Sequence, residues 1–344
     1  MEITWIIGNG FDLNCGLKSS YQDFIEKYWK KKAVASNQEK LEQAANKGGL
    51  LEVELWSDVE EEMGRITQVF ATETIAEYET IFSEMLALLI DYLKIQEETI
   101  SATNLVERNV AEFYNSVTGY QKRLAPTDQD KVPNHLGSEN NTYNFISLNY
   151  TTLIDSFVDA AKGKYNPFAR RGSYTDKVSG VFHIHGYADM EGAPVFGVGD
   201  KSQISNTDLA TDHEFCELWI KESQNEIAGN HRTSEFKSLV NRTNVFVLYG
   251  CSLGVTDEYL LCEIGRRMKQ NTSVVIVILD YELPSRTAPD RAPFVRRRRE
   301  VIDTFIRRAN ISESNREIYE KRIVVASSKT YFKFLKDNSG GTNG

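Results

Sequence analysis

The sequence predicts an α/β fold in which an open, Rossmann-like parallel sheet is covered by helices and carries an all-helical insertion. Three observations predict this fold. Short apolar segments rich in β-branched residues recur along the chain, helical patterns separate them, and one long stretch shows helical periodicity only. Strands that are apolar on both faces are typical of a parallel sheet covered by helices. Strands that alternate with helices indicate the same architecture.

The expected elements follow from where apolar residues recur along the chain. The predicted strands are residues 3–7, 143–148, 181–184, 245–249, 274–279 and 323–325, and the predicted helices are residues 21–31, 152–161, 235–240, 257–268 and 295–308.

Residues 34–139 form the predicted helical insertion, since they contain no convincing strand. Apolar residues recur there at helical spacing from Ile75 to Tyr92. This pattern is typical of helices packed on helices, with a partner-binding or dimerising face as the alternative. Residues 1–33 and 140–336 then build the Rossmann-like domain, and residues 337–344 form a tail that we expect to be disordered.

The composition is that of a globular protein and argues against a nucleic-acid-binding protein. A chain of 344 residues that is 41% hydrophobic buries a sizeable core, as one large domain with an insertion or as two domains. The formal net charge of -9 argues against a broad phosphate-backbone surface, so nucleic acid is not the expected partner.

Cysteine usage and hydropathy predict a cytoplasmic protein. The four cysteines include no CxxC pair, which suits reduced thiols. The longest apolar run, residues 274–279, is far shorter than the roughly 20 residues that a membrane helix needs. No Lys or Arg precedes the short apolar stretch after Glu2, so we expect no secretory signal.

The first predicted strand runs into a glycine-rich segment, GNGFDLNCGL at residues 8–17. Gly8 and Gly10 permit positive φ angles and let backbone N–H groups approach a diphosphate with no Cβ in the way. The usual dinucleotide fingerprint GxGxxG needs a glycine where this chain has Leu13, and a GxG after a strand is also common in tight turns. The third glycine is Gly16 instead.

This segment resembles the GAGIS loop of the sirtuin superfamily, and it resembles more closely the GNGFDL opening of the AbiH-like bacteriophage abortive-infection family. Further motifs follow in the order that these families imply, over most of the chain. They are WSDVE at residues 56–60, which resembles the W-x-D-x-E element of the abortive-infection family, Asn149 in SLNYT, His185 in HIHG and Ser252 in GCSLGVTD.

Asn149 follows a predicted strand, which places its amide at the carboxyl edge of the sheet. It either orients a ribose or a water, or it caps the helix that starts near Thr151. The resemblance implies the first role, since the sirtuin Asn helps to position the nicotinamide ribose and a water. Sirtuins have an Asp where this chain has Thr151, and usually a Ser where it has Asp12.

His185 ends another predicted strand, and a histidine with an unperturbed pKa near 6.5 suits proton transfer near neutral pH. It is our candidate general base, and the sirtuin histidine that it resembles supports this role. His183 alternates to the other face and is expected to be structural. A His-x-His pair also binds metals, but no further ligand stands at a recognisable spacing, so we expect no metal. The zinc-ribbon cysteines of protein-deacetylating sirtuins are missing.

Residues 250–254, GCSLG, match the GxSxG nucleophile elbow of α/β-hydrolases. The catalytic His of those enzymes follows the Ser, whereas all five histidines of this chain precede Ser252. The resemblance to sirtuins implies instead that Ser252 contacts phosphate or ribose at a helix N-terminus. Asp257 lies in the first turn of that helix, where the helix dipole stabilises a carboxylate.

Asp280 ends the next predicted strand, where a carboxylate accepts hydrogen bonds from an adenine-ribose diol, although an exposed turn residue is the alternative. The basic stretch at residues 296–299 is expected to be a solvated face. The predicted nucleotide-binding residues are Gly8, Asn9, Gly10, Phe11, Asp12, Gly250, Ser252, Leu253, Asp257 and Asp280.

The resemblance therefore implies an antiphage abortive-infection effector that binds NAD and hydrolyses it to nicotinamide and ADP-ribose, with Asn149 and His185 as catalytic residues. Such cleavage passes through an oxocarbenium-like state, for which a protein orients the ring, stabilises charge and places water. A nucleotide-sensing module without turnover and a hydrolase or nuclease for another nucleotide are the alternatives. The expected partners are NAD or a related nucleotide, with a homo-oligomer or a phage-derived trigger as regulator.

Overall fold

The computed structural model describes residues 1–48, 56–69, 75–133, 139–166, 168–188 and 194–335. They contain a seven-stranded sheet of order β3-β4-β2-β1-β5-β6-β7, in which only the β3–β4 pair is antiparallel. The strands are β1 Glu2–Ile7, β2 Thr142–Ser147, β3 Ala169–Arg171, β4 Tyr174–His183, β5 Val245–Tyr249, β6 Val275–Asp280 and β7 Ile323–Ser327.

β1 lies in the interior of the sheet and pairs with β2 on one side and β5 on the other, so that Ile6 stands opposite Ile146 and Leu248. After β1 the chain extends the sheet toward β2 and β4, and then in the opposite direction through β5, β6 and β7. The strand order therefore reverses between β1 and β5. The carboxyl ends of all the parallel strands lie at the same edge.

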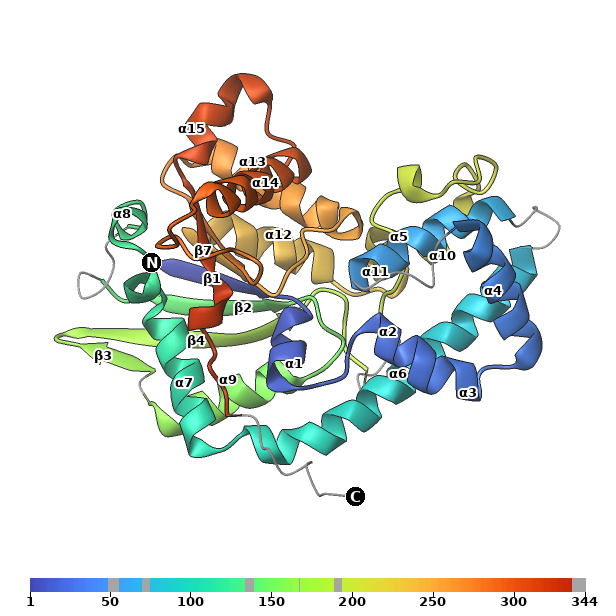
Figure 1. Cartoon of the computed structure of the whole chain (residues 1–344), viewed down its shortest axis with the longest axis horizontal. Helices are drawn as coiled ribbons and strands as arrows, with labels where there is room; N and C mark the ends of the chain where they lie inside the picture. Colours follow the sequence, from blue (N-terminus) through green and yellow to red (C-terminus); the bar gives the residue numbers. More distant parts are fainter. Residues whose placement is uncertain (49–55, 70–74, 134–138, 167, 189–193, 336–344) are drawn as a thin grey trace.

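Helices cover both faces of the sheet because alternate strand residues point to opposite sides. Ile3, Trp5 and Ile7 of β1 pack in one core cluster with α1 Gly10–Cys15, α7 Glu107–Thr118 and α9 Leu153–Lys164. Ile6 belongs to the cluster on the other face, which includes α12 Arg232–Arg242, α13 Glu258–Gln270 and α14 Ala292–Arg308. The sheet is thus the middle of three layers (Figure 1).

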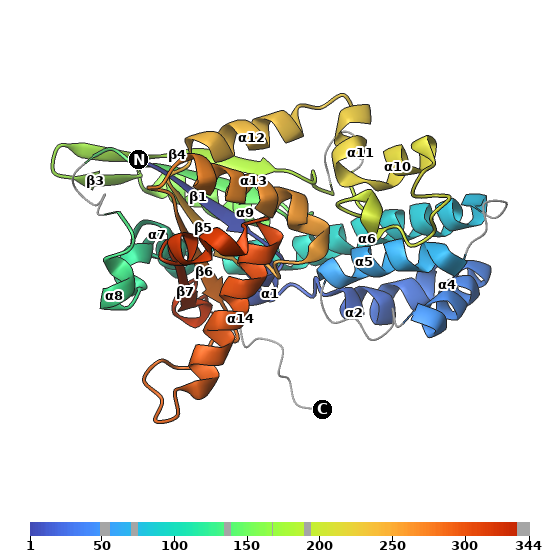
Figure 2. The ribbon, with the colours of Figure 1, turned by 90° about the horizontal axis from the view of Figure 1, so that it is seen from above.

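A third core cluster forms what we call the helical layer, which lies beyond the carboxyl ends of the strands (Figures 1 and 2). Aromatic side chains dominate it, and Phe82 packs against Trp219 with ring centroids 3.9 Å apart. The helical elements on this side are α2 Tyr21–Phe24, the π-helix η1 Ile25–Trp29, α3 Lys30–Lys32, α4 Ala35–Gly48, α5 Trp56–Ile66, α6 Ile75–Asn104, α10 His213–Trp219 and α11 Lys221–Ile227.

The predicted α/β fold with a mostly parallel sheet is confirmed, and all six predicted strands are present. The sequence missed β3 and the first residues of β4, which are partly exposed and carry polar side chains. The single helix predicted for residues 21–31 is divided into α2, η1 and α3. The division at residues 34 and 139 stays a prediction, although α7 packs against the sheet and α2 packs in the helical layer.

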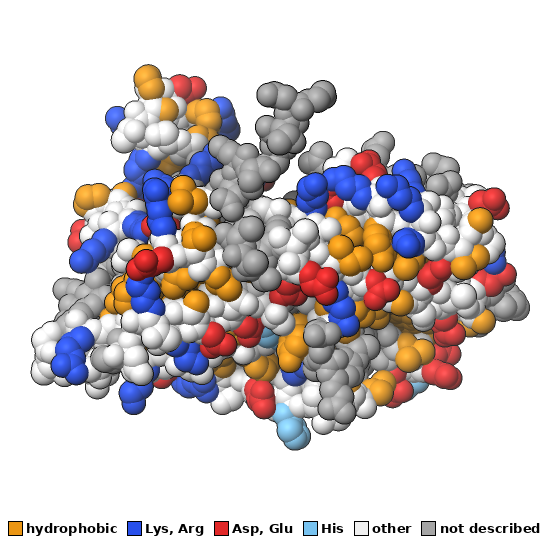
Figure 3. Space-filling model, turned by 90° about the horizontal axis from the view of Figure 1, so that it is seen from below, with side chains coloured by type: hydrophobic (Ala, Val, Ile, Leu, Met, Phe, Trp, Pro, Cys, Tyr) orange, Lys and Arg blue, Asp and Glu red, His pale blue; other side chains and the backbone are white. Residues whose placement is uncertain are grey.

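The remaining helices are α8 Pro126–Gln129 and α15 Arg316–Glu320. None of the helices in the described part of the chain combines the length and the apolar character needed to cross a membrane. On the face seen from below, Lys and Arg side chains are interspersed with Asp and Glu, and hydrophobic side chains gather over the helical layer (Figure 3). That face therefore carries no continuous basic stripe.

Candidate functional site

The polar residues predicted to form the site gather beyond the carboxyl ends of four strands. Residues 8–12 follow β1, Asn149 follows β2, His185 follows β4 and Gly250 follows β5. Open α/β sheets bind ligands at this edge, close to the point where the strand order reverses. Here the order reverses between β1 and β5. The fold therefore brings together residues that lie far apart in the sequence.

The loops after β1 and β5 contact each other backbone to backbone. The N–H of Gly8 donates to Tyr249 O at 2.9 Å, and that of Gly10 donates to Gly250 O at 3.0 Å. A Cβ added to Gly8 would lie 2.5 Å from Gly250 O, and one added to Gly10 would lie 2.5 Å from Gly250 Cα. Close approach of two backbones therefore accounts for these glycines.

Gly8 and Gly10 do not use the positive φ angles that glycine permits. The glycines of the two motifs that do so are Gly16, with φ 96° at the end of α1, and Gly250, with φ 69°. The N–H groups of Gly8, Gly10 and Phe11 already donate to backbone carbonyls. A diphosphate beside this loop would need other donors.

The other side chains of the glycine loop also make internal contacts. The Phe11 ring is buried against Phe113 and Phe157, so it anchors the loop in the core of the sheet. The Asn9 amide donates to Ser19 O at 3.1 Å and accepts from the Ser19 hydroxyl. Phe11 therefore holds the loop against the core of the sheet, and Asn9 holds it against Ser19.

Asp12 is the residue of this loop that faces the predicted catalytic asparagine. Its carboxylate accepts a hydrogen bond from Asn149 Nδ2 at 3.0 Å and another from Thr151 Oγ1 at 2.6 Å. The second N–H of Asn149 donates to Gly8 O at 3.3 Å. Burial raises the pKa of Asp12 from 3.8 to about 7, against the effect of these two donors and with a further contribution from the Glu97 carboxylate.

This cluster places a carboxylate beside Asn149 by a route that the sequence did not predict. The resemblance to sirtuins implied a Ser at position 12 and an Asp at position 151, but this chain has Asp12 and Thr151. In this chain the two side chains are hydrogen-bonded to each other. A carboxylate therefore lies beside Asn149, but it follows β1 rather than β2.

A second set of polar groups lies next to Asp12. His183 Nε2 is 2.8 Å from Asp155 Oδ2, and its Nδ1 is 3.4 Å from Asn149 O. The Glu97 carboxylate accepts from the backbone N–H and the hydroxyl of Thr152. Burial raises the pKa of Glu97. His183 therefore ties the Asn149 backbone to α9.

His185 is buried, with 3% of its side chain exposed. Its Nδ1 lies 3.3 Å from Leu148 O, so it donates there, which leaves the Nε2 lone pair to accept from the Tyr259 hydroxyl at 3.2 Å. Burial, aided by the Lys221 charge, lowers the pKa of His185 to about 3. The expectation of an ordinary histidine pKa is therefore wrong, and this neutral imidazole is a poor proton acceptor.

A buried ion network, formed by Lys221, Glu60 and Asp257, lies beside His185 and was not predicted from the sequence. Lys221 Nζ is 2.6 Å from Glu60 Oε2 and 3.2 Å from Asp257 Oδ1, and the Lys221 and Glu60 side chains are 1% and 3% exposed. The Tyr150 hydroxyl donates to Glu60 Oε1 at 3.2 Å. Burial opposes the charge on Lys221, but Asp257 and Glu60 raise its pKa.

Glu60 is the acidic end of the WSDVE segment, which pointed toward this network together with Asp257 of the GCSLGVTD motif. The segment lies on α5, but the side chains of residues 56–59 lie outside the described residues. Glu60 itself reaches Lys221 on α11 and Tyr150 after β2. The network therefore joins the helical layer to the carboxyl edge of the sheet.

The other predicted nucleotide-binding residues have different surroundings. Ser252 is exposed, whereas Leu253 is buried with φ 56°. Asp257 is the N-cap residue of α13, and its Oδ1 is 3.6 Å from His185 Nε2. Asp280 is not an isolated turn residue, because both of its oxygens accept from Arg297 at 3.0 Å. A ribose bound at Asp280 would therefore have to share its carboxylate with Arg297.

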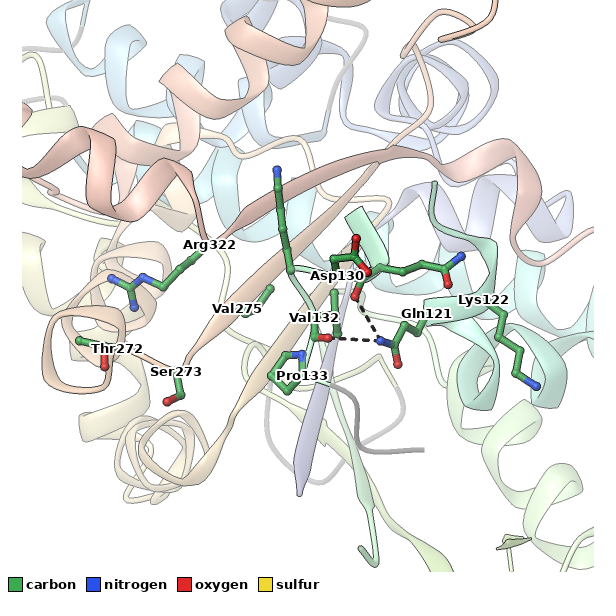
Figure 4. Close-up of a pocket in the computed structure, with 11 residues that line it drawn as sticks. Gln121, Lys122, Asp130, Val132, Pro133, Thr272, Ser273, Val275 and Arg322 are labelled. Atoms are coloured by element: carbon green, nitrogen blue, oxygen red, sulfur yellow. Dashed lines mark hydrogen bonds between the residues drawn. The ribbon is translucent and has the colours of Figure 1, made fainter. Parts of the chain in front are cut away.

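A hollow of about 760 Å³ lies at the opposite edge of the sheet, next to the start of β6. Lys122 and Arg322 line it but point away from each other (Figure 4). The Arg322 guanidinium donates to Met268 O and Asn271 O, both at 3.0 Å. These cations do not converge on a common anion position, so the carboxyl edge remains the better candidate site.

The described residues contain no group of three or more His, Cys, Asp or Glu side chains arranged to hold a metal ion. The model of one protein family, described as bacteriophage abortive infection AbiH, matches residues 4–278. This match begins in β1 and ends in β6, so it includes every predicted site residue except Asp280. A search of curated proteins finds no match.

Proposed function

Because the chain belongs to the bacteriophage abortive infection AbiH family, we propose that it is an antiphage effector that binds NAD and hydrolyses it to nicotinamide and ADP-ribose. The contact between Asn149 and Asp12 at the carboxyl edge is the observation that carries this proposal. It joins the residue expected to place a ribose and a water to a carboxylate, at the position where α/β sheets bind nucleotides.

The order of the parallel strands supports a dinucleotide. Numbered along the chain, the parallel strands β4-β2-β1-β5-β6-β7 have the order 3-2-1-4-5-6, which is the order of Rossmann folds. In that fold the dinucleotide lies across the reversal of strand order, here between β1 and β5. We assign the nicotinamide end to the side of β2 and β4, where Asn149 and His185 lie.

The charges near this edge suit cleavage of a glycosidic bond. The reaction develops positive charge on the ribose, so a surplus of carboxylates stabilises its transition state. Glu60 and Asp257 share the single cation Lys221, and the neutral imidazole of His185 adds no positive charge. Asn149 orients the ribose and the attacking water.

The proposed site is closed in this structure, which fits an activity that is silent until infection. Asp12, Asn149 and His185 are 1%, 5% and 3% exposed. Unregulated loss of NAD would kill the host, so entry of the dinucleotide has to await a trigger. We infer that a phage-derived component, or assembly with another copy of the chain, displaces the helical layer from the carboxyl edge.

The test follows NAD and free nicotinamide in cells challenged with phage. Cells that carry the wild-type chain should lose NAD and release nicotinamide, whereas His185→Ala and Asn149→Ala should abolish both effects together with protection. The control variant is His213→Ala, since the His213 side chain is 96% exposed and lies on α10. Protection that persists in both site variants with NAD unchanged would overturn the proposal.

The burial of the site also favours a second function, a nucleotide sensor that binds NAD or a derivative without cleaving it. A sensor of this kind needs a closed pocket, but it needs no residue that accepts a proton from an attacking water. Calorimetry with NAD and ADP-ribose on the full chain separates the two functions. Binding combined with protection but without any nicotinamide release would establish the sensor.

A further inference from the structure

The Asp12 carboxylate is buried, and no cation among the described residues is hydrogen-bonded to it. Among the described residues its partners are neutral donors, the Asn149 amide and the Thr151 hydroxyl. The buried carboxylate of Glu60, in contrast, is paired with Lys221. An isolated buried carboxylate is costly to ionise, and such groups are concentrated at functional sites. The burial of Asp12 among neutral donors therefore points to a chemical role for its carboxylate.

Each oxygen of a carboxylate accepts about two hydrogen bonds, and each Asp12 oxygen receives one from the residues named above. Both N–H groups of Asn149 are used, one by Asp12 and one by Gly8 O, so its amide oxygen is the atom left to meet a ligand. A water held between that amide oxygen and the Asp12 carboxylate would donate one hydrogen to each.

We propose that Asp12 is the general base of the reaction and takes the proton of the attacking water that Asn149 positions. This inference rests on the proposed NAD hydrolysis. In this scheme His185 is a positioning residue. Its imidazole donates to Leu148 O, which fixes the loop after β2, and accepts from the Tyr259 hydroxyl.

The step balances without any other reactant. The water oxygen forms a bond to C1′ of the nicotinamide ribose while the C1′–N bond breaks. The electron pair of that bond moves to the pyridinium nitrogen, so nicotinamide leaves neutral and needs no acid. One water proton passes to Asp12 and later to solvent. The products are ADP-ribose, nicotinamide and one proton.

The charged groups that surround Asp12 act in opposite directions on its proton. Glu97 on α6 raises its pKa, and His183 on β4 lowers it, while Asp155 on α9 is bound to His183. Burial is the dominant effect and brings the pKa of Asp12 to about 7. A base that titrates there is matched to proton transfer near neutral pH, whereas His185, with its pKa near 3, is not.

The test measures nicotinamide release against pH, using the full chain recovered from phage-challenged cells. Wild-type activity should rise through about pH 7, and Asp12→Asn should lose roughly 100-fold or more of it while NAD still binds. His185→Gln should lower activity but keep the same rise with pH. An Asp12→Asn variant that stays active, or a wild-type rate that does not change from pH 5 to 9, overturns the role of Asp12.

The exchange variant Asp12→Ser/Thr151→Asp supplies a second test. This variant moves the carboxylate from position 12 to position 151, on the other side of the same contact. Its rate of nicotinamide release should therefore be at least tenfold higher than that of Asp12→Asn. Infrared titration of the full chain supplies a readout besides activity, a carboxyl band that titrates near pH 7 and is missing in Asp12→Asn. If the wild-type chain shows that band but never releases nicotinamide, the proposal of NAD hydrolysis is overturned. If the wild-type chain releases nicotinamide but lacks the band, only the proposed role of Asp12 is overturned.

Discussion

Replacing Asp12 by Asn should stabilise the fold, and the gain should depend on pH. A group whose pKa is raised in the folded state stabilises the fold below its unfolded pKa, and this stability is lost as pH rises through the folded pKa. For Asp12 the two values are 3.8 and about 7. A tenfold change in a protonation equilibrium corresponds to about 1.4 kcal/mol, so the raised pKa of Asp12 lowers the free energy of unfolding, relative to its value at low pH, by about 2 kcal/mol at pH 5 and about 4 kcal/mol at pH 8.

Asn keeps the shape of the side chain and the bond from Asn149, and the Thr151 hydroxyl is able to rotate and accept from the new amide. Urea unfolding followed by tryptophan fluorescence, at pH 5 and pH 8, measures the free energy of unfolding. The gap between Asp12→Asn and the wild type should widen by about 2 kcal/mol between these pH values. Asp159→Asn is the control, since its side chain is 76% exposed. A gap that does not change with pH would refute the reasoning.

Two further changes test the packing around the site. Lys221→Met should destabilise the chain by about 3–5 kcal/mol in urea unfolding, because it leaves the buried Glu60 carboxylate unpaired, whereas Lys237→Met, at an exposed ion pair, should cost less than about 1 kcal/mol. A loss equal to that of the control would contradict the first expectation. Gly250→Ala should cost about 2–4 kcal/mol, since φ is 69° and its Cβ would lie 2.8 Å from Gly10 Cα; an unchanged melting temperature would contradict it.

The sequence predicted the elements that depend on local pattern. The strands buried on both faces, such as β5 and β6, were found because their apolar runs are continuous. β3 escaped because it is a short antiparallel extension of β4 at the edge of the sheet, with the sequence ARR. Periodicity reports burial, so an edge strand with little burial leaves little signal.

The site was predictable only in part, because its contacts join distant positions. Asn149 and His185 follow strands, so the rule for carboxyl edges located them. The bond from Thr151 to Asp12 spans 139 positions and the bond from Lys221 to Glu60 spans 161, and no local pattern encodes either. The role of the glycine motif in binding phosphate stays a prediction, and the structure gives its glycines a different physical reason, the contact between two backbones.

The two buried carboxylates, Glu60 and Asp12, differ in how their charge is balanced, and this difference bears on how the proposed site would open. A buried ion pair adds little net stability, but it penalises every arrangement that separates its members. Lys221 therefore fixes α5 against the carboxyl edge through Glu60, and α13 through Asp257. Asp12 has no such partner among the described residues, so its ionisation works against the folded state. Movement of α5 would break the ion pair between Glu60 and Lys221. If the proposed displacement of the helical layer also brings water to Asp12, the desolvation that raises its pKa is relieved, and the proposed base ionises in the same step.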